Sequence, residues 1–546
     1  MITFSRHFAF RPKLIDCLRG YNREIFIADL LAGITVGIVA LPLAMAFAIA
    51  SGVKPEAGIF TAIIAGFIIS ALGGSRVQIG GPTGAFIVIV YGIVVQYGLA
   101  NLLICTFMAG CILLAMGVLR LGVLIKFIPL PVIIGFTNGI AVLIFLSQIK
   151  DFLGLETGPL PAEFFAQIRA LGSALHTASW QTLAVASASL LLIASWPNRW
   201  GKRVPGPVVV LLLGGLAAAL FNLPIETIGS KFGGIPQTLP QFKAPDLSLD
   251  HLRYLIVPAI TIALLGAIES LLCAVVADGM IKDKHDANQE LIAQGIANIV
   301  TPFFGGIPAT GAIARTSVNI RNGGRTPIAG MIHALVLLLI VLVAAPLAKY
   351  IPLACMSAIL IMVAVRMGDW SEFKTMPRYS PGRTATLLST FILTVVFDLT
   401  IAVQVGILWA SLLLVRRMAQ VTVVARVRHG ENDRVIAGVV VYEASGALFF
   451  GAADTLEVLS RAHDHGLKTL VLDLSHVIYM DSTATHTLEM VRYELQARGL
   501  NLLVCGAHQQ PASMIRQSGL LDMLGADLLP DRAAALMRAQ NIGAAA

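Results

Sequence analysis

Residues 80–85 read GGPTGA, and residues 305–312 read GGIPATGA. The two motifs are related, because each places glycine and proline shortly before a Thr-Gly-Ala triplet. Each opens an apolar segment that is shorter than the roughly 20 residues a helix needs to cross a bilayer. Short segments interrupted by glycine and proline at matching positions of two halves are typical of a transporter's binding site. The pair therefore predicts two half-helices that meet inside a membrane domain.

The prolines of the two motifs, Pro82 and Pro308, fit the first turn of a helix, where a missing N–H costs nothing. The N–H groups that follow, those of residues 83–85 and 310–312, are then expected to lack partners. Each half-helix start carries about half a positive elementary charge. Two such ends facing each other would attract an anion. The alternative is that glycine and proline only kink two packed helices.

The composition around these motifs is that of a membrane protein. Apolar residues make up 57% of the 546 positions and charged residues 13%, and the mean hydropathy is +0.81. A soluble domain carries about 25% charged residues, so this chain lacks the charges to cover a water-exposed surface. The net charge of +8 fits basic cytoplasmic loops rather than nucleic-acid binding. Six scattered cysteines, without a CxxC pair or a His-flanked cluster, suggest neither a metal site nor a disulfide framework.

Apolar segments follow one another between residues 28 and 418. Fourteen of them predict membrane spans, at 28–50, 57–73, 82–97, 101–119, 122–147, 179–196, 206–221, 253–277, 289–304, 309–322, 326–345, 352–366, 384–399 and 401–415. An even number of spans puts both termini on one side, and the Lys/Arg-rich loops of that side indicate the cytoplasm. We therefore expect a multi-pass protein of the plasma membrane, a bacterial inner membrane, with a cytoplasmic segment at 1–27 and a transport domain at 28–418.

Beyond residue 418 the sequence alternates short apolar runs with amphipathic stretches. This alternation predicts a cytoplasmic α/β domain at 435–546, joined by a linker at 419–434. The expected strands are 435–442, 446–450, 468–474 and 501–505, and the expected helices are 452–465, 483–498, 510–519 and 531–540.

Two ionisable residues within the predicted spans, Arg315 and Glu269, are candidates for a role in transport. Arg315 follows the second half-helix start, where its cation would reinforce the attraction for an anion, and a structural ion pair is the alternative. Glu269 lies in the middle of a span, and an intramembrane carboxylate is a functional hypothesis by default. A protonated Glu269 would stop repelling an anion, which gives a route to coupled entry of a proton and an anion. The alternatives for Glu269 are a sodium ligand or a permanent partner for Arg315.

Four stretches resemble the sulfate permease (SulP) family, the solute-carrier-26 type. They are GITVGIVALPLAMAFAIAS at 33–51, GGSRVQIGGPTGAFI at 73–87, GGIPATGAIARTSVNIRNGGRT at 305–326, and LDLSHVIYMDSTAT at 472–485, which is similar to the STAS domain of these permeases. The resemblance implies a polytopic α-helical fold with a 7+7 inverted repeat of 14 spans. Spans 1–4 and 8–11 would form a core domain and the other spans a gate domain, followed by a C-terminal α/β STAS domain.

The resemblance also implies a site, with the anion between the half-helices of spans 3 and 10. Carried over to this chain, the substrate-binding residues are Phe47, Thr83, Gly84, Ala85, Ala312, Ile313, Ala314 and Arg315, with Glu269 alongside as the proton-coupling group. Movement of the core against the gate would give elevator-type alternating access. Many members of the family are dimers, so a homodimer is expected.

Several positions depart from the family's pattern. Leu43 stands where several relatives have a polar residue, and Ala314 stands where many have serine. Sodium-coupled bicarbonate relatives look to use Asp and Thr at places that hold Glu269, Cys273 and Ile313 here. A hard cation prefers oxygen ligands, so these departures favour H⁺ over Na⁺ as the coupling ion. The weakly polar pocket leaves sulfate, bicarbonate and dicarboxylate open as substrates.

In the STAS-like tail the resemblance makes Ser482 a candidate phosphorylation site. The alternative is that Asp481 or Ser482 simply caps the N-terminus of a helix. The tail has no glycine pattern for nucleotide binding. Its expected role is therefore regulation or binding of a cytoplasmic protein partner.

The sequence as a whole predicts a secondary anion transporter that is coupled to protons and needs no cofactor. An uncoupled anion channel or exchanger on the same scaffold is the first alternative. A membrane-anchored signalling protein with the STAS domain as its output is the second. An enzyme is not expected, because no nucleophile–base pair, metal cluster or cofactor fingerprint stands out.

Overall fold

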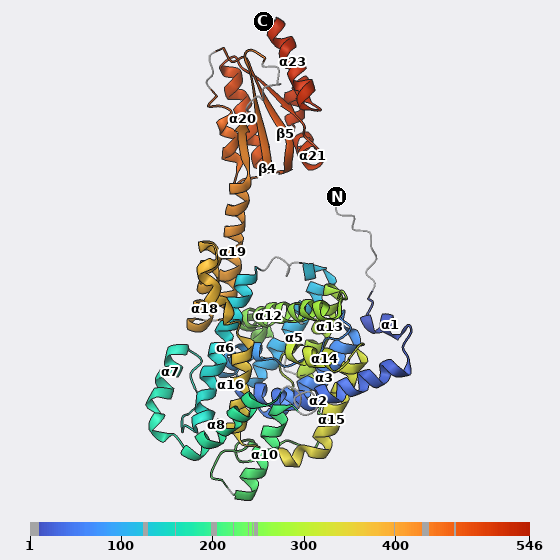
Figure 1. Cartoon of the computed structure of the whole chain (residues 1–546), viewed down its shortest axis with the longest axis vertical. Coiled ribbons are helices and arrows are strands. Elements are labelled where there is room, and N and C mark those ends of the chain that lie inside the picture. Colours follow the sequence, from blue (N-terminus) through green and yellow to red (C-terminus); the bar gives the residue numbers. More distant parts are fainter. Residues whose placement is uncertain are drawn as a thin grey trace. The chain divides into compact units, whose positions relative to one another are not determined.

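The computed structural model describes residues 10–123, 129–158, 160–197, 205–221, 223–238, 240–242, 244, 249–397, 399–427, 436–462 and 466–545. The chain forms two compact units, Met1–Ile407 and Leu408–Ala546. The first unit is helical apart from one pair of two-residue strands, and the second contains a five-stranded sheet (Figure 1).

The helices of the first unit follow the apolar segments of the sequence. They are α1 Lys13–Leu18, α2 Arg23–Ala50, α3 Pro55–Leu72, α4 Ile87–Tyr97, α5 Leu99–Val118, α6 Leu130–Leu153, α7 Phe164–Ser173, α8 Trp180–Ser195, α10 Gly206–Phe221, α11 Ile228–Phe232, α12 Leu249–Ile281, α13 Ala287–Val300, α14 Ile313–Arg321, α15 Ile328–Ala348, α16 Leu353–Met367, α17 Ser371–Thr375 and α18 Pro381–Val396. Helix α19, Leu399–Val421, continues into the second unit. Single turns of 3-10 helix lie at η1 Gly84–Phe86, η3 Leu175–Thr177, η4 Thr301–Phe304 and η5 Met376–Arg378.

Each of the fourteen segments that the sequence predicts as spans overlaps one of these helices. In the described part of the chain, seven helical stretches are long and apolar enough to cross a membrane by themselves. Three further apolar helices of the described chain, Gly84–Tyr97, Trp180–Ser195 and Gly206–Phe221, are shorter, so fourteen spans stay a prediction.

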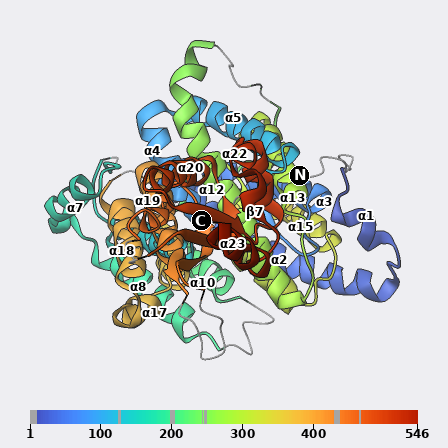
Figure 2. The ribbon, with the colours of Figure 1, turned by 90° about the horizontal axis from the view of Figure 1, so that it is seen from above.

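The helices of the first unit pack in two groups. Helices α2, α3, α5, α12, α13, α14 and α15 contact one another, and α6 contacts α8, α16 and α18. In Figure 2, α8 and α18 lie on one side of this unit and α3, α13 and α15 on the other. Glycines allow the close contacts: a Cβ on Gly295 of α13 would lie 2.5 Å from the backbone nitrogen of Leu114 in α5, and one on Gly135 of α6 would lie 2.5 Å from the carbonyl oxygen of Leu387 in α18.

The second unit is an α/β domain whose sheet has the order β3-β4-β5-β6-β7. The strands are β3 Val423–Arg426, β4 Val439–Leu448, β5 Thr469–Met480, β6 Asn501–Cys505 and β7 Leu528–Leu529. Strand β3 is antiparallel to β4, and the other neighbours are parallel. The helical elements are η6 Ala453–Val458, α20 Ser482–Ala497, α21 Gln509–Gln517, α22 Leu520–Leu524, η7 Gly525–Asp527 and α23 Arg532–Ala545.

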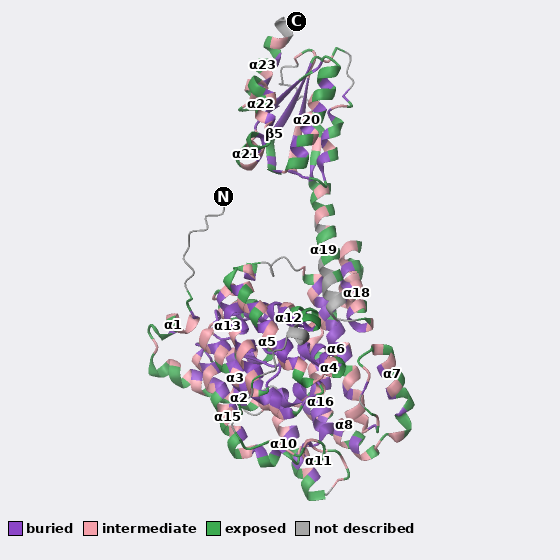
Figure 3. Ribbon diagram, turned by 180° about the vertical axis from the view of Figure 1, so that it is seen from behind, coloured by how far each residue is buried: buried purple, intermediate pink, exposed green. Residues whose placement is uncertain are grey.

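Both faces of this sheet are covered, as the side-chain alternation of its strands requires. Leu470, Leu472 and Leu474 of β5 pack with the helices α20 to α22, whereas Val471 packs with α23. Figure 3 shows this sheet, largely buried, between α20 and α23, and the first six residues of β5, Thr469–Leu474, are all buried. Arg532 of α23 ties the sheet together, because it donates hydrogen bonds to Asp473 of β5 at 2.7 Å and to Glu443 of β4 at 2.6 Å.

Several of the predicted elements in this domain were wrong. The expected strands 435–442 and 446–450 belong to one strand, β4, which has irregular register around Ser445 and Gly446. Gly446 adopts φ +97° at this irregularity. An irregularity of this kind interrupts the alternation of inward and outward side chains from which strands are predicted. The described part of the expected helix 452–465 contains only η6. Strand β3 lies inside the predicted linker and β7 was missed, because two to four residues carry little periodicity.

Candidate functional site

The two related motifs lie side by side in the first unit. Gly80–Gly81 forms strand β1 and Thr310–Gly311 forms strand β2, and the two strands pair antiparallel with Gly80 opposite Gly311 and Gly81 opposite Thr310. The contact continues beyond Gly80, because the Ala312 N–H donates to the carbonyl of Ile79 at 2.8 Å and the Ile79 N–H donates to Oγ1 of Thr316 at 3.0 Å. The starts of η1–α4 and of α14 are thus joined at one point.

The helix starts differ in detail from the prediction. Helix η1 begins at Gly84 and α14 at Ile313, so Pro82 and Pro308 precede the helices instead of occupying their first turns. The N–H groups of residues 310–312 are also not all free, because residues 310 and 311 belong to the β pair and the Ala312 N–H is bonded. The strand pairing takes these residues out of the helical conformation. The groups left without intrahelical partners are those of the first turns that begin at Gly84 and Ile313.

The helix start at Gly84, called the first tip below, is enclosed by three apolar side chains. A Cβ on Gly84 would lie 3.4 Å from Cδ1 of Ile144, 3.6 Å from Cε1 of Phe47 and 3.7 Å from Sδ of Met367. These walls come from α6, α2 and α16. Thr83 and Ala85 are buried, and the Thr83 hydroxyl has no hydrogen-bond partner in the described part of the chain. The tip therefore offers amide and hydroxyl groups inside an apolar surround.

The helix start at Ile313, called the second tip below, is more open. Ala312 is buried and Ile313 is half-buried, whereas Ala314 is exposed. The structure thus brings Phe47, Thr83 and Gly84 together at the first tip and places Ala314 at an accessible edge of the second.

Arg315 points from the second tip back toward the first. Its side chain is only 1% exposed, and Nη2 donates to the carbonyl oxygen of Pro82 at 3.0 Å. The other guanidinium nitrogens, Nε and Nη1, find no partner among the described residues. The close approach needs glycine at position 81, because a Cβ there would collide with Nη1 of Arg315. The cation therefore lies at the junction of the two tips.

Glu269 lies on the face of α12 that contacts the second motif. Gly266, three residues before it, accepts a hydrogen bond from the Thr310 hydroxyl at 2.9 Å, and Cys273, four residues after it, lies 3.3 Å from Oγ1 of Thr316. Residues at these spacings share one face of a helix. Glu269 is half-buried and makes no hydrogen bond or ion pair with any described residue. Its predicted alternative as a permanent partner of Arg315 is wrong, since the described residues contain no ion pair between them.

Sequence reasoning missed a buried carboxylate close to the first motif, that of Glu290 in α13. It is fully buried, and one oxygen accepts hydrogen bonds from the N–H groups of Gly74 at 2.9 Å and Ser75 at 3.3 Å. The other accepts hydrogen bonds from Gln78 at 3.0 Å, Gln294 at 3.1 Å and Ser270 at 3.4 Å. Glu290 thus holds the loop that leads into β1. The polar run NQELIAQGIAN within an expected span was the available signal.

The other predicted chemistry is located as follows. Asp481 caps α20, because its Oδ1 accepts from the Ala484 N–H at 2.9 Å, which confirms the capping alternative for this residue. Ser482 is exposed at the first position of that helix. No group of three or more His, Cys, Asp or Glu side chains that could hold a metal ion occurs within the described ranges.

Known protein families and relatives match nearly the whole chain. The sulfate permease family matches residues 26–390, and the STAS domain matches residues 432–535. A putative sulfate transporter of Bacillus subtilis, YvdB, is 45% identical over 514 residues, which cover 93% of this chain and 96% of that protein.

Two solved structures have folds similar to that of this chain. The transmembrane domain of a cyanobacterial bicarbonate transporter, BicA, matches with a TM-score of 0.63 and 32% identity, covering 72% of this chain and 98% of that one. Murine solute carrier 26 family member A9, an anion transporter in the inward-facing state, matches with a TM-score of 0.87 and 18% identity, covering 97% of this chain and 94% of that one.

Proposed function

This chain belongs to the sulfate permease family and carries a STAS domain, and on that premise we propose that it is a proton-coupled secondary anion transporter. It is a multi-pass membrane transporter and not an enzyme. The substrate is a small anion of the sulfate, bicarbonate or dicarboxylate class. The names of the relatives support the first two, since YvdB is described as a putative sulfate transporter and BicA as a bicarbonate transporter.

The observation that carries the proposal is the paired junction of the two half-helix tips. Two helix starts that share a β pair concentrate N–H groups and partial positive charge in one place. Arg315 adds a full positive charge there, with no carboxylate paired to it in the described chain. In our proposal the anion binds at this junction, near Phe47, Thr83, Gly84, Ala85, Ala312, Ile313, Ala314 and Arg315.

Glu269 is the proposed proton-coupling group. It faces the second motif from α12 and has no cation or hydrogen-bond donor of its own among the described residues. An ionised carboxylate in such a place would oppose a bound anion through space, and a neutral one would not. Binding of a proton and binding of an anion would then favour each other, which is the thermodynamic requirement for symport. In this proposal H⁺ is favoured over Na⁺, because the side chains of Cys273 and Ile313 carry no hard oxygen ligand.

Transport would proceed by movement of one helix group against the other. The walls around Gly84 come from both groups, since Phe47 belongs to α2 whereas Ile144 and Met367 belong to α6 and α16. A shift between the groups would therefore open or close the first tip. We propose elevator-type alternating access on a 7+7 inverted repeat of 14 spans, in a homodimer with both termini in the cytoplasm. The STAS domain would bind a regulatory protein partner, and Ser482, exposed at a helix N-terminus, is its candidate phosphorylation site.

The test is uptake by the purified full-length chain in proteoliposomes. Radiolabelled sulfate, bicarbonate, succinate, fumarate and chloride are offered with and without an inward proton gradient. One anion should accumulate only with the gradient, and the Glu269→Gln variant should lose that dependence while retaining exchange of the same anion. The Glu163→Gln variant, which removes a carboxylate outside the site, is the control. Gradient-driven accumulation by Glu269→Gln would remove Glu269 from the coupling role.

The same preparation separates the two alternatives. An anion channel would give flux that does not saturate with substrate and follows voltage alone. A signalling protein with STAS output would lose all function when residues 425–546 are deleted, whereas a transporter should keep measurable flux through the membrane domain.

A further inference from the structure

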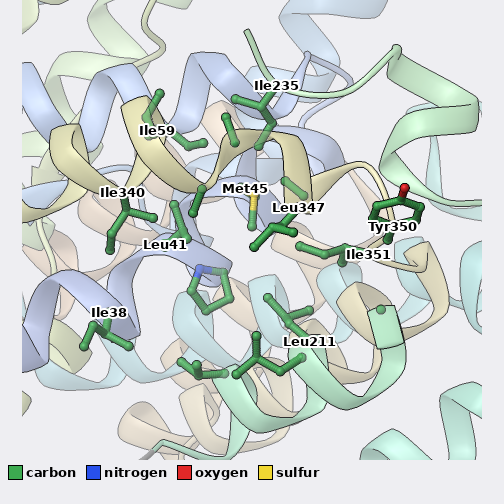
Figure 4. A pocket seen from close by; sticks show the side chains of 18 of the residues that line it. Ile38, Leu41, Met45, Ile59, Leu211, Ile235, Ile340, Leu347, Tyr350 and Ile351 are labelled. Atoms are coloured by element: carbon green, nitrogen blue, oxygen red, sulfur yellow. The ribbon is translucent and has the colours of Figure 1, made fainter. Parts of the chain in front are cut away.

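The first unit contains a cavity away from the junction of the half-helices. Its volume is about 500 Å³, within the range of cavities that hold small organic ligands. Helices α2, α10 and α15 supply most of its wall, and Tyr350 and Ile351 close one end. In Figure 4 the side chains of Leu41, Met45, Leu211 and Leu347 point toward one another across this space.

The lining of the cavity is almost free of hydrogen-bonding side chains. Of its twenty lining residues, Tyr350 alone carries a hydroxyl, amide or charged group, and the others are Ile, Leu, Val, Ala, Met, Pro or Gly. A buried water needs two to four polar partners, so this space is a poor site for water. Its chemistry suits an apolar ligand.

The walls of the cavity continue onto the outer surface of the same helices. Leu212 and Leu216 of α10 are 64% and 55% exposed, and Leu347 of α15 is 66% exposed, although all three also line the cavity. On a helix of a membrane transporter such exposed leucines face hydrocarbon. A ligand that enters past them comes from the bilayer, where the abundant apolar ligand is an acyl chain.

A cation lies at the end of the cavity that Tyr350 closes. The Lys349 ammonium is 4.9 Å from the centroid of the Tyr350 ring, and the residue is exposed. Lys349 forms no ion pair with any carboxylate in the described ranges, whereas the neighbouring Lys231 pairs with Asp151 and Glu226. An ammonium group that is not paired with a carboxylate complements a phosphate group.

We propose that this cavity binds one acyl chain of an anionic bilayer phospholipid, with the phosphate of that lipid against Lys349 and Tyr350. The chain lies between α10 on one side and α2 with α15 on the other. Helix α10 contacts α8 and α16 of the second helix group, whereas α2 and α15 belong to the first. The acyl chain would therefore fill space between the two groups, and its presence would set how closely they approach.

Gly215 of α10 allows the cavity to be filled selectively. It lines the cavity, and a Cβ placed on it would have no neighbour closer than the Tyr350 carbonyl oxygen at 3.7 Å, so the first carbon of a side chain is accommodated. The Gly215→Leu variant directs a side chain into the space that the acyl chain would occupy. The matched control is Gly92→Leu, because Gly92 is also a helical glycine, has no heavy atom within 4 Å of a built Cβ, and does not line the cavity.

The experiment uses the full-length protein in nanodiscs that contain phosphatidylglycerol with a photoreactive diazirine on its acyl chain. After irradiation, mass spectrometry locates the labelled peptides. In the wild type, labelling should concentrate on residues 206–221 and 340–351 and should saturate as the fraction of probe rises. Gly215→Leu should lower this labelling about tenfold, whereas Gly92→Leu should leave it unchanged. Equal labelling of the two variants, or labelling that rises linearly on all lipid-facing helices, would overturn the proposal.

Lys349→Gln tests the lipid headgroup without altering the cavity. In competition with the photoreactive probe, unlabelled phosphatidylglycerol should displace it from the wild type better than phosphatidylcholine does. The variant should lose that preference. A wild type without any preference would contradict the phosphate contact, and displacement by free fatty acid alone would identify a different occupant.

Discussion

The two half-helix tips are alike in sequence and differ in what surrounds them. The first, at Thr83 and Gly84, is enclosed by side chains from three helices, and its loop is held by Glu290. The second, at Ile313 and Ala314, is partly open. Arg315, in the first turn of its helix, reaches back to the carbonyl of Pro82 in the first motif. The repeated sequence thus builds one site from two unequal parts.

In the proposed anion site, this difference would combine attraction with selection by shape. The enclosed tip would restrict the size of the bound anion, because its apolar walls already touch the position that a Cβ on Gly84 would occupy. The open tip supplies the charge, but that charge lies at the junction and not at the accessible edge. A site arranged in this way would hold an anion through the helix ends and use the guanidinium to keep those ends together.

The largest effect is expected from Gly81→Ala, which should separate the two tips. Gly81 has φ +148°, and a Cβ there would collide with Nη1 of Arg315. We expect a loss of about 1–3 kcal/mol of stability from the strained backbone and the displaced guanidinium, with uptake abolished. Thermal unfolding of the detergent-purified chain and uptake in proteoliposomes measure both effects. Gly92→Ala, where a Cβ has no neighbour within 4 Å, is the control, and a stable, active Gly81→Ala protein would refute the junction.

Replacing Arg315 removes the link between the tips and leaves the backbone intact. Arg315→Ala takes away a hydrogen bond from a charged group, which contributes about 1.5–3 kcal/mol, so anion affinity should fall roughly 10- to 100-fold. Arg315→Lys should recover part of it, because lysine restores the charge without the planar fork of donors. Isothermal titration with the transported anion measures the affinity. An unchanged affinity in Arg315→Ala would remove Arg315 from the site.

Glu290→Gln tests whether the first tip depends on the loop before it. The amide would present a donor to groups that now donate to a carboxylate, and each buried donor left unsatisfied costs about 1–3 kcal/mol. We expect a lower unfolding temperature and a higher KM, with both tips still joined. Glu156→Gln, on an exposed loop, is the control, and wild-type stability of Glu290→Gln would show that the loop is held by other contacts.

Gly84→Ala should have the smallest effect on folding and sharpens the size argument. The added methyl would lie 3.4 Å from Cδ1 of Ile144, an ordinary contact, so stability should change by no more than about 0.5 kcal/mol. The methyl narrows the space beside Phe47 and Met367, so KM should rise several-fold more for dicarboxylates than for bicarbonate. Competition uptake with both anions measures the ratio. An equal change for both would mean that the enclosed tip does not select by size.

Much of the membrane unit follows from local sequence. The fourteen apolar segments all overlap helices, because a long apolar run in lipid must satisfy its own backbone hydrogen bonds and a helix does so within one segment. The meeting of the two motifs was predicted from their glycines and prolines, although their pairing as strands was not. The second unit was harder, since β3 and β7 are four and two residues long and Gly446 interrupts the alternation of β4.

By itself the sequence determined the class of protein, the positions of the helices, the two half-helix motifs and the family, because hydropathy and local motifs act over a few residues. Tertiary structure alone decided that residues 80–81 and 310–311 pair as strands and that Arg315 donates to the carbonyl of Pro82. It also decided that Ile144 and Met367 face Gly84, and that Glu290 accepts hydrogen bonds from five donors. These contacts join residues far apart in the chain. Their partners are selected by packing and by the need to satisfy buried polar groups, which no local pattern records.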